Sequence, residues 1–64
     1  MMLWDCVQRA VAAGWVYVHT AAGQHSLCNW LWKWPRDGSD EKGWRFDAVA
    51  GMISQGAHHF LLTK

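Results

Sequence analysis

The sequence predicts a small α+β protein of one domain, in the order α-β-β-α-β, with a three-stranded, mainly antiparallel sheet and two helices on one face. Three observations predict this class. The 64 residues suffice for a single domain. A composition of 52% hydrophobic and 17% charged residues is that of a globular chain. Segments with helical apolar spacing alternate with segments rich in β-branched and aromatic residues.

Residues 3–13 are predicted to form the first helix, followed directly by a strand over residues 15–20. Asp5 in the first turn suits the positive end of the helix dipole, and Gly14 stands where a C′ glycine ends a helix. Residues 15–20 are β-branched or aromatic for the most part, which favours a strand. The apolar residues that share one helical face are Leu3, Val7, Ala10 and Val11.

Residues 21–24 are predicted to turn the chain, but residues 25–34 fit two structures. In a strand, one side would carry Cys28, Trp30, Trp32 and Trp34. In a helix, one stripe would carry Leu27, Trp30, Leu31 and Trp34. We favour the strand, because a hairpin with residues 15–20 gives both segments a partner.

A charged, turn-rich loop at residues 36–43 precedes a second predicted helix at residues 46–55. Asp47 lies in its first turn and Gly56 ends it, before a last strand at residues 57–63. If the last strand pairs with the first, the sheet has the order 2-1-3, and its other face and two edges stay uncovered. The helical stripe consists of Phe46, Val49, Ala50 and Ile53.

The first helix and the second also align with each other at an offset of 42 residues. This alignment pairs Trp4 with Phe46, which heads the second helical stripe. Two helix–Gly–strand units that obey the same local rules would produce such an alignment without a duplication. Because Trp4 aligns with Phe46, which heads an apolar stripe, we expect Trp4 to lie in the core.

The charge pattern argues against nucleic acid and membranes as partners. The formal net charge is +1, and the basic residues are scattered rather than clustered. Residues 10–32 carry no formal charge, but glycine, histidine and amide residues interrupt the run, which excludes a spanning helix. The N-terminus lacks a basic region followed by an apolar one, so we expect a cytoplasmic protein.

No pattern for catalysis, metal binding or a cofactor stands out in the sequence. The four histidines and two cysteines show no recognised ligand spacing, and His58 and His59 would point to opposite faces of a strand. No carboxylate lies in an apolar stretch that would raise its pKa. The sequence therefore predicts no catalytic residue, no metal site and no cofactor.

Residues 7–28 contain a Gly-Trp pair at the start of a strand, within Ala13-Gly14-Trp15-Val16-Tyr17-Val18, and a turn with Gly23-Gln24-His25. This stretch resembles the opening of the HicA-type toxins, which have a helix, a Gly-Trp strand start and a Gly-Ser-His turn. Gln24 stands where that family has serine. The resemblance implies RNA cleavage with His25 as the catalytic histidine.

The tryptophans are the strongest functional signal. We expect Trp30, Trp32 and Trp34 to bind a partner, because indoles are enriched at binding hot spots and three of them would make a large apolar patch. The predicted function is a non-enzymatic interaction protein of the inhibitor or adaptor type, a type that mobile elements commonly encode. Its partner would be another protein, itself, or both. The alternatives are an RNA-cleaving toxin and a weak binder of single-stranded nucleic acid that stacks bases on Trp30 and Trp32.

Overall fold

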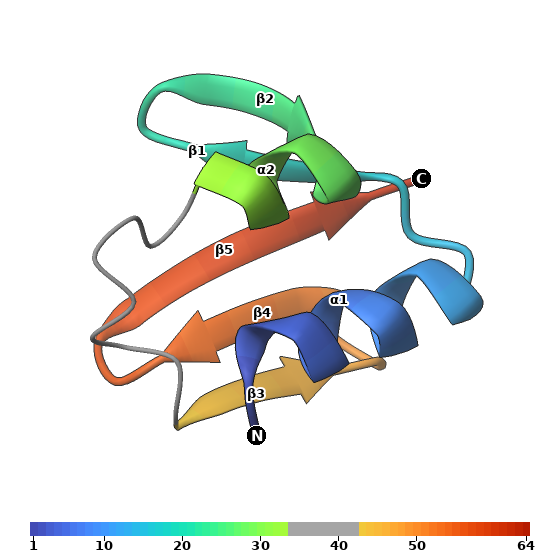
Figure 1. The fold of residues 1–64 in the computed structure, drawn as a ribbon, viewed down its shortest axis with the longest axis vertical. Helices are drawn as coiled ribbons and strands as arrows, with labels where there is room; N and C mark the ends of the chain where they lie inside the picture. Colours follow the sequence, from blue (N-terminus) through green and yellow to red (C-terminus); the bar gives the residue numbers. More distant parts are fainter. Residues whose placement is uncertain (34–42) are drawn as a thin grey trace.

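The computed structural model describes residues 1–33 and 43–64, which form a five-stranded antiparallel sheet with two helices on one face (Figure 1). The strand order is β2-β1-β5-β4-β3. The α+β class is as predicted, with five strands instead of three. The elements are α1 (Leu3–Ala12), β1 (Tyr17–Thr20), β2 (Gly23–Ser26), α2 (Leu27–Lys33), β3 (Trp44–Asp47), β4 (Met52–Gln55) and β5 (His58–Thr63).

The first helix and the pairing of the first and last strands are confirmed. The helix α1 ends at Ala12, and Gly14 follows with a φ of 95°, a conformation that suits glycine at C′. Strand β1 pairs with β5 in the register Val18↔Leu62, and both of these side chains are buried. Figure 1 shows α1 and α2 on the same side of this sheet.

Residues 25–33 do not form the favoured strand, because only residues 25 and 26 belong to a strand, β2, and Leu27–Lys33 is helix α2. The hairpin partner of β1 lies earlier, in β2, where Val18 pairs with His25. The hydroxyl Oγ of Ser26 then accepts a hydrogen bond from the N–H of Asn29 at 3.3 Å, which is the geometry of a helix N-cap. The helical alternative is therefore correct for residues 27–33.

The predicted helix at residues 46–55 is wrong, because this segment is the β3–β4 hairpin. Phe46 and Ile53 are seven residues apart, a spacing that fits two helical turns but also fits cross-strand partners, and here they pair across the hairpin. The Oδ1 atom of Asp47 accepts hydrogen bonds from the N–H groups of Val49 and Ala50, each at 3.0 Å. This local cap forms one tight turn, and no further helical turn follows it.

The alignment at an offset of 42 residues therefore does not mark two copies of one unit. Its first member is a helix and its second member is a hairpin. The two segments share only an apolar spacing that both structures can use.

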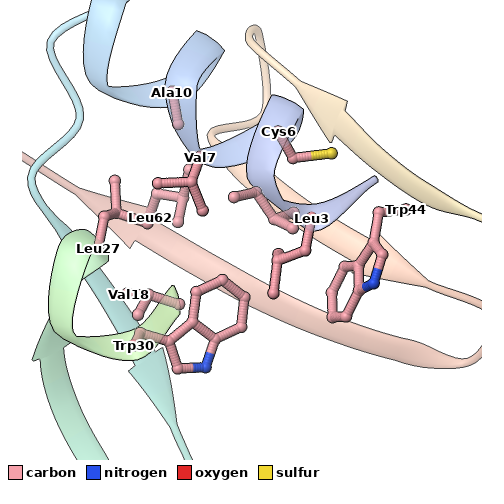
Figure 2. Close-up of a cluster of buried hydrophobic side chains, with 10 residues drawn as sticks. Leu3, Cys6, Val7, Ala10, Val18, Leu27, Trp30, Trp44 and Leu62 are labelled. Atoms are coloured by element: carbon pink, nitrogen blue, oxygen red, sulfur yellow. The ribbon is translucent and has the colours of Figure 1, made fainter. Parts of the chain in front are cut away.

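The core lies between the helices and the sheet (Figure 2). Its centre is aromatic: the ring of Trp30 from α2 meets the ring of Trp44 from β3 edge-on, with 6.0 Å between centroids. The ring centroid of Phe60 from β5 lies 5.1 Å from that of Trp30 and 6.1 Å from that of Trp44, so the three rings form one cluster. The buried residues are Leu3, Cys6, Val7, Ala10, Val18, Leu27, Trp30, Trp44, Ile53 and Leu62.

Candidate functional site

The three tryptophans predicted to bind a partner do not form one ladder. Trp30 is buried, with 3% of its surface exposed, whereas Trp32 is 75% exposed. Residues that are two positions apart on a helix are rotated by about 200° about its axis, so the two side chains leave α2 on opposite sides. Trp34 lies outside the described residues. Trp32 is the member of the predicted set that the structure places on the surface.

Trp4 is not a core residue, contrary to the expectation. Its side chain is 53% exposed, because Leu3, Cys6 and Val7 supply the face of α1 that packs on the sheet. Trp4 lies beside this face, on the flank that looks toward α2. The helical spacing of α1 shows only that Trp4, one residue after Leu3, is rotated by about 100° from it and so lies beside the buried face.

Trp4 and Trp32 line a groove between the two helices, which we call the Trp groove. It has a volume of about 250 Å³. None of the described residues that line it carries a charge. They are Trp4, Val7, Gln8, Val11, Cys28, Leu31 and Trp32.

The two cysteines differ in accessibility, and one of them reports on the Trp groove. Cys28 is exposed and lines the groove, while Cys6 is fully buried in the core. Burial raises the pKa of the Cys6 thiol, and the nearby N-terminal amine opposes this shift without cancelling it. The thiolate is the reactive species. Cys6 is therefore unreactive for two reasons: reagents cannot reach it, and its raised pKa keeps it in the thiol form.

A second and larger hollow, which we call the histidine pocket, lies between the β1–β2 turn, α2 and the start of β5. Its volume is about 470 Å³. His25 and His58 face it from the helix side of the sheet, because His25 pairs with the buried Val18 and His58 alternates with Phe60. The lining residues are Thr20, Ala21, Ala22, His25, Trp30, His58 and Phe60.

The other two histidines lie on the opposite face of the sheet. His59 pairs with Ser54, and His19 pairs with Gln24 and Leu61. The ring of His19 also shares a hydrogen bond with the hydroxyl of Thr63 at 3.1 Å. The described residues therefore hold two histidines on each face, and among them no three His, Cys, Asp or Glu side chains gather as a metal site would require.

No helix within residues 1–33 and 43–64 is long and apolar enough to cross a membrane.

Comparison of the chain with models of protein families, with curated proteins and with solved structures finds no match. The resemblance to HicA-type toxins therefore rests on residues 7–28, and an RNA-cleaving role for His25 remains a prediction from that resemblance. The structure places His25 in a pocket whose described lining includes neither a carboxylate nor a lysine or arginine. His58 could exchange protons with a substrate beside His25, but cleavage of RNA also needs a cation near the phosphate, and the described lining supplies neither lysine nor arginine.

We expect that expression of the wild-type chain and of His25→Ala gives equal growth of the host. The reason is that the described lining of the pocket offers no lysine or arginine to stabilise the phosphate during cleavage. Growth curves under induction measure this, with far-UV circular dichroism to show that the variant folds. Growth arrest by the wild type that disappears with His25→Ala, while the fold persists, would establish the toxin instead.

Proposed function

We propose that this protein is a non-enzymatic interaction module that associates with a second copy of itself through the Trp groove. The observation that carries the proposal is the pair of exposed indoles, Trp4 at 53% and Trp32 at 75%, on a groove between two helices whose described lining carries no charge. Rigid indoles contribute much contact area at little cost in side-chain entropy, which is why they dominate binding hot spots.

The absence of charge in the described lining favours a second copy as the partner. A two-fold symmetric interface brings the same patch of both subunits face to face, so a charged patch would repel itself. The Trp groove lies between Val11 on α1 and Leu31 on α2. Its described lining can therefore face the same lining of a second copy without repulsion between like charges. The near-neutral net charge of +1 adds little long-range repulsion between two chains.

A dimer interface of standard size would cover only a part of the protein surface. The accessible surface of the chain is 4268 Å². A standard interface buries about 800 Å² per partner, which is about a fifth of this surface. An indole side chain contributes about 150–250 Å² when fully buried, so the two exposed indoles form a substantial part of the apolar centre.

Cys28 allows the proposal to be tested at the groove itself. We expect its reaction with a thiol reagent to slow as the protein concentration rises from low to high micromolar, because the second copy covers the groove. Cys6 stays unreactive at all concentrations, since it is buried. Labelling rates followed by mass spectrometry of the intact chain measure the effect.

The matched variants are Trp32→Ala in the groove and Val49→Ala in the β3–β4 turn, where Val49 is 98% exposed. Trp32→Ala should remove the concentration dependence of Cys28 labelling, and Val49→Ala should retain it. A wild-type labelling rate that is independent of concentration would rule out self-association through this groove.

A further inference from the structure

The histidine pocket has the form of a small-molecule site, and it lies apart from the Trp groove. Its volume of about 470 Å³ falls in the range of pockets that bind small ligands. Aromatic rings of Trp30 and Phe60 form one part of its wall, and alanines of the β1–β2 turn form another. His25 and His58 add polar groups from two separate strands.

One residue of the wall, Trp30, carries a buried polar group that has no partner among the described residues. The Nε1 atom of Trp30 is buried and makes no hydrogen bond within residues 1–33 and 43–64. Burying an N–H donor without an acceptor costs about 1–3 kcal/mol, and buried indole N–H groups usually find one. Figure 2 shows this nitrogen on the edge of the ring that is turned away from Leu3 and Val7.

The two histidines offer the polar contacts that fix the orientation of a ligand. A neutral imidazole presents one N–H donor and one acceptor nitrogen. His25 and His58 present these groups to one pocket from β2 and β5, which β1 separates in the sheet. His59, next in the chain, lies on the opposite face and serves as a natural comparison.

From these observations we infer that the histidine pocket binds a small, uncharged, planar aromatic molecule that carries a hydrogen-bond acceptor. The described lining includes no Asp, Glu, Lys or Arg, so a charged ligand would lose its hydration without gaining an ion pair. Trp30 and Phe60 favour a planar ring, because aromatic pairs gain from offset and edge contacts. The acceptor satisfies the indole N–H of Trp30.

The Trp30 nitrogen is shielded from solvent in the free protein, so its hydrogen bond to the ligand requires a small shift of the indole ring. Binding therefore changes the surroundings of the indole proton directly. Two-dimensional NMR observes this proton as a separate signal, which is assigned by its loss in Trp30→Phe.

Three probes of similar shape test the ligand class. Coumarin is a neutral, planar bicycle with a carbonyl acceptor, naphthalene lacks the acceptor, and coumarin-3-carboxylate adds a negative charge. We expect coumarin to produce saturable shifts of the Trp30 indole proton and of the His25 and His58 ring signals. It should bind several-fold more tightly than either other probe.

The pair His58→Ala and His59→Ala tests the site. His58→Ala should weaken coumarin binding several-fold, whereas His59→Ala, on the other face of the sheet, should leave it unchanged. Trp32→Ala should also leave it unchanged, which separates this inference from the Trp groove. The inference is overturned if coumarin leaves the Trp30 indole signal unmoved, if the two histidine variants behave alike, or if the carboxylate binds best.

Discussion

Replacing Trp44 by alanine should unfold the protein or leave it barely folded. The side chain of Trp44 is fully buried at the start of β3, against the rings of Trp30 and Phe60. Removing a buried tryptophan side chain costs about 3–5 kcal/mol. Small domains have roughly 0.05–0.15 kcal/mol of stability per residue, so this loss is comparable to the whole stability of a chain of 64 residues.

Trp32→Ala is the control for this prediction, because it removes the same side chain from an exposed position. Its effect on the unfolding of the monomer should stay within about 1 kcal/mol, as for most surface substitutions. Urea denaturation followed by far-UV circular dichroism, at protein concentrations low enough to favour the monomer, compares the two variants. If Trp32→Ala unfolds as early as Trp44→Ala, Trp32 belongs to the core and the Trp groove is not a surface.

Among the glycines that the structure describes, Gly51 is expected to be the one whose substitution by alanine is most damaging. Gly51 ends the β3–β4 turn with a φ of 66°, which costs a residue with a side chain about 1–2 kcal/mol. A Cβ atom at this position would also lie 2.5 Å from the nearest ring atom of Trp15. The backbone cannot easily retreat, because the Gly51 N–H donates to Asp47 at 2.9 Å and its carbonyl accepts from Leu62 at 2.8 Å. Overpacking of this kind adds about 1–3 kcal/mol.

Gly56→Ala separates the two causes. Gly56 has a φ of 58°, close to that of Gly51, but a Cβ atom there would meet nothing within 4 Å. Its substitution should cost the backbone term alone, and Gly51→Ala should cost about 1–3 kcal/mol more. Thermal melts of both variants measure the difference. Equal losses of stability would show that the ring of Trp15 does not pack against Gly51.

The parts of the fold that follow from local spacing could be predicted from the sequence. The helix α1 shows a clean apolar face and ends before Gly14, and strand β1 consists largely of β-branched and aromatic residues. The predicted order 2-1-3 places the last strand beside the first, and β5 does pair with β1.

The remaining elements depend on polar atoms that spacing does not reveal. A spacing of seven residues between Phe46 and Ile53 fits a helix and a hairpin equally, and the carboxylate of Asp47 decides for the turn by accepting two backbone N–H groups. The cap at Ser26 decides in the same way for helix α2. Ser26, three residues before Asn29, was the signal in the sequence that could have indicated a helix start.

The candidate site could be predicted only in part, since it requires two helices to lie side by side. Trp32 is exposed as the partner-binding prediction needs, whereas Trp30 became part of the core once its segment formed a helix. Trp4 and Cys28 join Trp32 in the groove because α1 packs beside α2. The histidine pocket likewise combines β2, α2 and β5, which are separate in the sequence.

Sedimentation equilibrium of the wild type and of Trp32→Ala, at low and high micromolar concentration, tests self-association through the Trp groove most directly. The wild type should approach twice the chain mass of 7.3 kDa as its concentration rises, because burying two copies of Trp32 and Trp4 stabilises the dimer. Trp32→Ala should remain at 7.3 kDa throughout while keeping its far-UV spectrum. A wild type that stays at 7.3 kDa at high micromolar concentration, or a Trp32→Ala variant that dimerises as well as the wild type, would show that the groove does not join two copies of this chain.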